Sequence, residues 1–214
     1  QKVAMLKSLM TVSGFTLLSR ITGFARDMLT SYYFGAGALG DTWVAAFRFP
    51  NLFRRVLGEG AFNSAFVPLY SGKLAEEGEE VAFDFSSRIL ILLSMLLSII
   101  CVVSYIFMAP ITKALTSGFD AEKLALATDL SRITVSYLFF ICLVAALSGV
   151  LNSHKRFAAP AFSYVSLNLV FLVGLLGVIP FVEGIDQKVA VLAWCLPIGG
   201  FVQLLIVILG ACKT

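Results

Sequence analysis

Residues 89 to 111, ILILLSMLLSIICVVSYIFMAPI, decide the fold because they form a long apolar run without a charged residue. A bilayer core about 30 Å thick is crossed by about 20 apolar residues in a helix, and this run is long enough. It has no polar stripe that would face water, which is typical of a helix surrounded by lipid. We therefore expect an all-α integral membrane protein.

Three further segments have the same character, namely residues 133 to 151, 157 to 182 and 189 to 212. Composition agrees, since 59% of the 214 residues are hydrophobic and 14% are charged, whereas soluble proteins carry about 25% charged residues. Residues 8 to 34 and 41 to 70 are also long enough to cross a bilayer, but they contain charges. The sequence thus predicts a bundle of six transmembrane helices.

Composition also argues against several functions. Basic residues are not clustered with aromatic ones, so we expect no nucleic-acid partner. His154 is the single histidine and the four cysteines lie apart in apolar runs, so we predict no metal site and no cofactor. The sequence contains no phosphate-binding glycine loop and no catalytic triad, which favours binding and movement over catalysis.

The basic residues of the short loops predict the orientation. If the N-terminus is cytosolic, the loops on the inner side carry more Lys and Arg than those on the outer side, as the positive-inside rule requires. We therefore expect both ends to be cytosolic. The longest polar segment, residues 71 to 88, would then be an inner loop or a short surface helix.

Arg20 and Arg26 lie inside the first segment, in the stretch SRITGFARD of residues 19 to 27. An arginine at the centre of a membrane helix costs about 2.5 to 3.5 kcal/mol, whereas a large apolar residue returns about 0.3 to 0.6 kcal/mol. With lipid on all sides the helix would insert poorly. We therefore expect both arginines to face the bundle interior or a water-filled cavity.

The second segment carries charges in a helical pattern. Asp41, Arg48 and Arg55 recur every seven residues and so lie near one helix face, with Glu59 one turn beyond Arg55. Arg54 points about a quarter turn away. Pro50, which the same segment contains, should kink the helix and change the projection beyond it.

Two interpretations of these charges remain open. Arg26 with Asp27 and Arg55 with Glu59 could simply join helices. However, five arginines face three acids in the two segments, and the surplus predicts an anionic ligand, with phosphate or pyrophosphate matching the guanidinium fork. Three polar residues of the 157 to 182 segment could line the same cavity, although we expect them mainly to join helices: Ser163, Ser166 and Asn168.

Three stretches resemble the MurJ/MviN family of lipid II flippases, which belongs to the multidrug/oligosaccharidyl-lipid/polysaccharide exporter superfamily. They are SRITGFARD, FGAGALGDTWVAAFRFPNLFRRVLGEGAFNSAFVPLY at 34 to 70, and LNSHKRFAAPAF at 151 to 162. The resemblance implies a transporter that moves lipid II, the undecaprenyl-pyrophosphate-linked disaccharide-peptide, across the bacterial inner membrane. It also implies alternating access between two lobes of six helices each, and membrane lipids as further partners.

The resemblance assigns roles to individual residues. Arg20, Arg26 and Arg54 match the family's cavity arginines and are expected to bind the pyrophosphate, while Asp27 orients Arg26 or contacts the head group. The further cavity or gate candidates are Ser19, Asp41, Arg48, Arg55 and Glu59.

The family has fourteen helices and six are predicted here, so residues 1 to 214 are expected to form its N-terminal lobe. The C-terminal lobe would come from the same protein or from another chain. Two alternatives remain open. One is a related exporter of drugs or of other polyprenyl-linked glycans, and the other is a membrane scaffold that transports nothing.

Overall fold

The computed structural model describes residues 2–35, 37–58 and 61–212, and their regular secondary structure is entirely helical. The first half of the chain contains α1 (Lys2–Phe34), α2 (Ala38–Phe53), a π-helical turn (Arg54–Gly58), α3 (Ala61–Glu76), α4 (Glu79–Ile106) and α5 (Met108–Leu115). The second half contains α6 (Ala121–Thr134), α7 (Ser136–Ser153), α8 (Ala158–Val173), a π-helical turn (Gly174–Val178), a 3-10 turn (Ile179–Phe181) and α9 (Ile185–Cys212).

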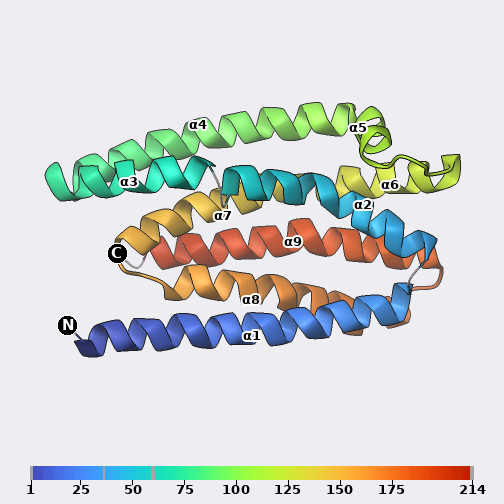
Figure 1. Ribbon diagram of the computed structural model, residues 1–214, viewed down its shortest axis with the longest axis horizontal. Helices are drawn as coiled ribbons and strands as arrows, with labels where there is room; N and C mark the ends of the chain where they lie inside the picture. The colour runs from blue at the N-terminus through green and yellow to red at the C-terminus, as the bar shows by residue number, and fades with distance from the viewer. Residues whose placement is uncertain (1, 36, 59–60, 213–214) are drawn as a thin grey trace.

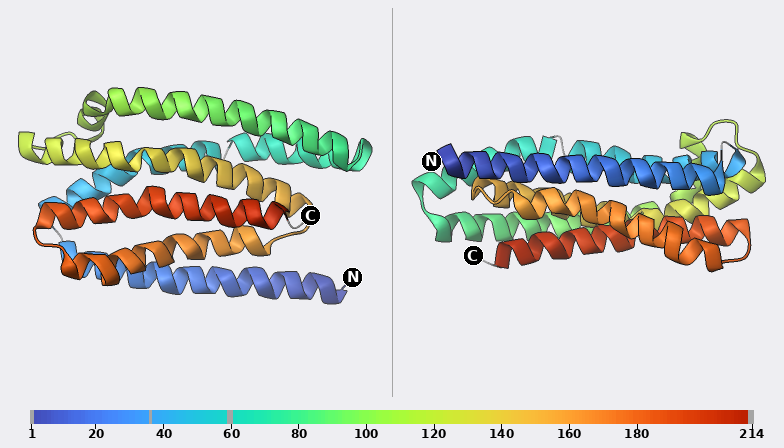
Figure 2. Two further views of the ribbon diagram at one scale, coloured as in Figure 1. Left: turned by 180° about the vertical axis from the view of Figure 1, so that it is seen from behind. Right: turned by 90° about the horizontal axis from the view of Figure 1, so that it is seen from below.

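The long helices lie side by side and run back and forth along one axis (Figures 1 and 2). Helix α3 continues roughly the direction of α2, and α7 that of α6, so each pair acts as one long interrupted rod. Both termini lie at the same end of the bundle, and the short α5 lies at the other end. Helix α1 runs along the edge, beside α8.

Four helical segments of the described chain are long and apolar enough to cross a membrane. They are Glu79–Ile106, Ala121–Ser153, Ala158–Phe181 and Ile185–Cys212. These segments confirm the prediction of an all-α membrane protein, and each overlaps one of the four uncharged runs. The run at 89 to 111 is interrupted, because α4 ends at Ile106 and α5 begins at Met108. Helix α1 and the α2–α3 pair, which carry the arginines, are not among them, so the count of six spans stays a prediction.

The polar segment 71 to 88 differs from the predicted loop or short surface helix. Helix α3 continues to Glu76 and α4 begins at Glu79, and the turn between them contains Gly78 with a φ of 91°. Ion pairs at the i,i+4 spacing support the helices, with Lys73 2.9 Å from Glu77 and Arg88 2.8 Å from Asp84. Charged residues thus extend two helices instead of forming a loop.

The segment predicted at 133 to 151 begins earlier, at the start of α6. The Asp120 side chain caps this helix by accepting a hydrogen bond of 2.9 Å from the Lys123 amide. Helix α6 is much less apolar than α7, so most of its residues do not belong to an apolar run. The continuous helical segment Ala121–Ser153 results.

The core is centred on α7 and α9. Leu138 and Ala146 of α7 and Leu192 and Leu196 of α9 are fully buried in one hydrophobic cluster. Close packing of the two helices depends on Gly200 of α9, because a Cβ there would lie 2.8 Å from the Tyr137 ring of α7. Helices α1, α2 and α8 surround this pair, and their polar residues form the site described next.

Candidate functional site

Arg26 of α1 is the best-anchored of the predicted arginines. Its Nη1 donates to Asn168 Oδ1 on α8 at 3.0 Å, and its Nε and Nη2 donate to Asp27 Oδ1 at 3.0 and 2.8 Å. The guanidinium carbon also lies 5.5 Å from the centroid of the Phe171 ring, within cation–π range. The side chain still keeps 29% of its surface exposed, so it is oriented and remains accessible.

Asn168 connects α1 to α8 at this point. It is buried, and its Nδ2 donates to the Ser19 carbonyl oxygen at 3.0 Å and to Thr22 Oγ1 at 3.3 Å. Gly23 of α1 faces this amide, and a Cβ there would lie 3.4 Å from Asn168 Nδ2, at van der Waals contact. From the sequence we expected Asn168 mainly to join helices, and the structure shows that it does so while also binding Arg26.

A cavity of about 170 Å³ lies beside Arg26. At about 30 Å³ per water it holds only a few water molecules, so a large head group would not fit inside it. Three residues of α1 form its polar side, and side chains of α2, α8 and α9 form the rest: Arg26, Asp27, Thr30, Trp43, Phe47, Leu167, Phe171 and Leu196.

Arg20 lies on α1 beside a second pocket of about 430 Å³ between α1 and α8. Its side chain is exposed. Ser19, Thr16 and Tyr164 also line this pocket. The structure thus places Arg20 at a larger opening than Arg26, along the same pair of helices.

Arg54 opens the π-helical turn that follows α2. It is half-buried, and its Nε donates to Asn51 Oδ1 at 3.1 Å. Arg54 and Arg26 both lie within electrostatic range of Tyr137, a fully buried residue of α7. Two guanidinium groups that are distant in sequence therefore lie near the same tyrosine. Tyr164, at the Arg20 pocket, also interacts with Tyr137.

The remaining candidates of the second segment that the structure describes, Asp41, Arg48 and Arg55, are all exposed. Arg48 is exposed, and its Nη1 donates to the carbonyl oxygen of Leu115 at the end of α5, at 3.2 Å. Asp41 is exposed in the first turn of α2, where an acid suits the helix dipole. Arg55 is exposed within the π-helical turn, and Glu59 lies outside the described residues. The wider turn breaks the seven-residue projection that a straight helix would give.

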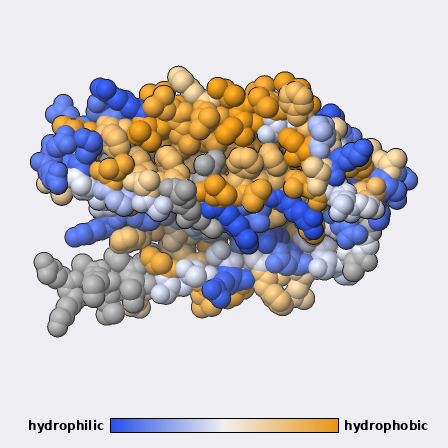
Figure 3. Space-filling view, turned by 45° about the horizontal axis from the view of Figure 1, so that its top comes forward, coloured by the Kyte–Doolittle hydropathy of each residue, from blue (hydrophilic) through white to orange (hydrophobic). Residues whose placement is uncertain are grey.

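Hydrophilic residues follow a depression across one face of the molecule, between broader hydrophobic areas (Figure 3). Together with the lipid-compatible helices, this arrangement defines a multi-pass, all-helical membrane protein that carries polar residues between its helices.

A family model described as "Lipid II flippase MurJ" matches residues 30–214. The chain belongs to this family. Among the relatives, "Probable lipid II flippase MurJ" of Rhizobium tropici is 42% identical over 134 residues, which cover 61% of this chain and 25% of that protein. "Lipid II flippase MurJ" of Burkholderia cenocepacia is 38% identical over 129 residues, which cover 59% of this chain and 25% of that protein. The matched region thus spans about a quarter of these relatives.

The fold is similar to a solved structure described as "Lipid II flippase MurJ, inward closed conformation". The two chains share 29% sequence identity with a TM-score of 0.71, and the match covers 94% of this chain and 42% of that one. These findings confirm the resemblance seen in the sequence. A flippase is a transporter, in agreement with the expectation that this protein moves a ligand instead of transforming it.

Proposed function

We propose that residues 1 to 214 form the N-terminal six-helix lobe of a flippase that moves lipid II across the bacterial inner membrane. In this proposal Arg20, Arg26 and Arg54 bind the pyrophosphate, and Asp27 orients Arg26. The main support, beside the family, is the anchoring of Arg26. Asp27, Asn168 and Phe171 hold its guanidinium while part of its surface stays exposed.

The hydrogen-bond capacity of Arg26 suits this role. A guanidinium group has five N–H donors, and three hydrogen bonds of Arg26 to Asp27 and Asn168 are accounted for. Two donors are left for phosphate oxygens. Because the side chain is already held in place, binding costs little additional conformational entropy.

Alternating access would require this lobe to move against a second lobe, supplied by the same protein or by another chain. Transporters of this kind bind substrate between such lobes and change which side is open. The interrupted α2–α3 rod, with Pro50 and the π-helical turn, is where we expect the lobe to bend. Asp41, Arg48, Arg55 and Glu59 would then form gate pairs, and Ser19 would line the cavity.

The test is transport of lipid II by the complete protein in proteoliposomes. We expect Arg20→Ala, Arg26→Ala and Arg54→Ala each to lower the rate at least about tenfold, because charge-assisted hydrogen bonds contribute about 1.5 to 3 kcal/mol. Arg88→Ala is the matched control, since Arg88 is exposed on α4 and pairs only with Asp84 among the described residues.

Wild-type transport by all three variants would overturn the assignment. Retained transport by the swapped pair Arg26→Asp with Asp27→Arg would favour the interpretation that these charges simply join helices. Competition by other polyprenyl pyrophosphates at equal strength would favour the broader glycan exporter. A variant that fails to transport must also unfold like the wild type, so that loss of fold is not mistaken for loss of binding.

A further inference from the structure

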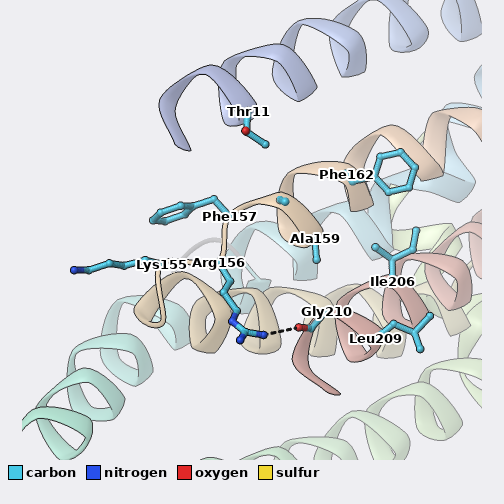
Figure 4. A pocket seen from close by; sticks show the side chains of 10 residues that line it. Thr11, Lys155, Arg156, Phe157, Ala159, Phe162, Ile206, Leu209 and Gly210 are labelled. Atoms are coloured by element: carbon cyan, nitrogen blue, oxygen red, sulfur yellow. Dashed lines mark hydrogen bonds between the residues drawn. The ribbon is translucent and has the colours of Figure 1, made fainter. Parts of the chain in front are cut away.

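A larger hollow, of about 680 Å³, lies at the end of the bundle where both termini are found (Figure 4). It lies between an early turn of α1, the start of α8 and the last turns of α9. Most of its wall is apolar, and its lining residues in the described chain include no acid: Thr11, Lys155, Arg156, Phe157, Ala158, Ala159, Phe162, Ile206, Leu209 and Gly210.

Two basic residues form one edge of this hollow. Arg156 is half-buried, and its Nη1 donates to the Gly210 carbonyl oxygen of α9 at 3.3 Å. Lys155 is exposed and extends outward beside Phe157 (Figure 4). Within the described residues neither makes an ion pair with an acid. Their positive charge is therefore available to an external anion.

The backbone around Lys155 is unusual. Its φ is 60°, and it is the one non-glycine residue of the described chain with a positive φ. This turn ends α7, where the Arg156 amide donates to the Leu151 carbonyl oxygen at 2.9 Å. Glycine is the usual residue at such a helix end, so a lysine here is not explained by backbone preference.

The start of α8 adds to the positive potential. The helix begins after Phe157, and no side chain caps it. Pro160 at the third position has no N–H, so Ala158 and Ala159 supply the amide groups at this helix start, where the helix dipole favours an anion. A basic pair and an uncapped helix start thus meet beside an apolar wall formed by Phe162, Ile206 and Leu209.

We propose that this hollow binds an anionic glycerophospholipid. The phosphate lies at Lys155, Arg156 and the start of α8, and an acyl chain lies along the apolar wall. Charge complementarity and the mixed lining select a lipid over a free phosphate, because a small anion would leave the wall unfilled. The location fits as well, since lipid phosphates lie at the ends of transmembrane helices. The proposal does not depend on transport.

The experiment is a titration of the purified complete protein in detergent with dioleoyl phosphatidylglycerol or dioleoyl phosphatidylcholine, with bound lipid counted by native mass spectrometry. We expect tighter binding of phosphatidylglycerol at one site. Arg156→Ala and Lys155→Gly should each weaken that binding about tenfold, as loss of a charge-assisted hydrogen bond would. Ala158→Trp should weaken the binding of both lipids, because the larger side chain fills the hollow.

Lys155→Gly separates binding from folding, because glycine relieves the positive φ while removing the charge. We expect this variant to unfold at the wild-type temperature or above it and still to bind less phosphatidylglycerol. Lys113→Ala, which removes an exposed lysine of α5 at the opposite end, is the matched control and should bind normally. Equal binding of the two lipids by the wild type would overturn the proposal. So would unchanged phosphatidylglycerol binding by Arg156→Ala and Lys155→Gly, or complete displacement of the lipid by millimolar inorganic phosphate.

Discussion

Asn168 uses both ends of one amide group between two helices. Its Oδ1 accepts from Arg26 while its Nδ2 donates to the Ser19 carbonyl oxygen. An amide can do this because it carries a donor and an acceptor on adjacent atoms. The same residue therefore fixes the distance between α1 and α8 and the direction of the Arg26 guanidinium.

Replacing Asn168 should affect the stability of the fold and the site differently. Asn168→Ala removes the hydrogen bonds that join α8 to the half-buried Ser19, Thr22 and Arg26 of α1 and should lower the free energy of unfolding by about 1 to 3 kcal/mol. Asn168→Asp keeps an acceptor and adds a negative charge beside Arg26, so it should weaken binding of lipid II about tenfold, since attraction for the pyrophosphate falls. Thermal unfolding and a lipid II binding assay measure the two effects.

Ser166→Ala is the matched control for Asn168. Ser166 is also buried on α8, but its hydroxyl donates only to the Ser163 carbonyl oxygen of its own helix. We expect normal lipid II binding by this variant. If Asn168→Asp also binds lipid II normally, Asn168 only joins the helices and does not orient Arg26.

The pairing of Arg26 with Asp27 could be predicted because the two residues are adjacent in sequence. The bond from Arg26 to Asn168 spans 142 positions, and no spacing rule connects them. Likewise, Tyr137 was not singled out, because a tyrosine in an apolar run looks like any core residue. Only the fold shows that both Arg26 and Arg54 act on it.

At the scale of elements, the close contact between α7 and α9 fixes the position of Tyr137, which faces Gly200 of α9. A Cβ at Gly200 would lie 2.8 Å from a ring carbon of Tyr137 and 2.9 Å from the Cβ of Phe140. Tyr137 is fully buried and lies within electrostatic range of Arg26 and Arg54. Small residues at such contacts let membrane helices approach closely.

Gly200→Ala should therefore destabilise the protein by about 1 to 3 kcal/mol through overpacking. Gly72→Ala makes the same change in α3, where a Cβ meets nothing within 4 Å, and should be neutral or stabilise by up to about 1 kcal/mol because alanine favours helix. Thermal unfolding in detergent compares the two. Equal unfolding temperatures would show that α9 can shift away from α7 at little cost.

Helix ends were predicted less well than helix centres. The apolar runs located the middle of each membrane helix because lipid demands them. Helix α6 and the ends of α3 and α4 extend beyond these runs and are stabilised by an Asp120 cap and by ion pairs such as Lys73 with Glu77. Such polar features resemble those of a loop when only hydropathy is considered.

At the scale of the whole molecule, the helix ends alternate between the two ends of the bundle, as the predicted topology requires. The turn between α3 and α4, the turn between α7 and α8 and the end of α9 lie at one end of the bundle, and the start of α9 lies at the other (Figure 1). The charged α1 lies against α8 rather than alone in lipid, so its arginines share polar neighbours. This placement explains how a helix with Arg20 and Arg26 could cross the membrane.

Labelling of cysteines in intact cells tests this topology. In a Cys212→Ser background, Glu77→Cys and Asp186→Cys place exposed thiols at opposite ends of the bundle. The positive-inside rule puts the Glu77 end in the cytosol. A membrane-impermeant maleimide should therefore label Asp186→Cys in intact cells, but Glu77→Cys only after the cells are opened.

The native Cys142 and Cys195 are buried and should stay unlabelled, because maleimides react with accessible thiolates. Labelling of both introduced cysteines in intact cells would mean that an even number of crossings separates Glu77 from Asp186, so one of the three segments between them, Glu79–Ile106, Ala121–Ser153 or Ala158–Phe181, would not cross the bilayer.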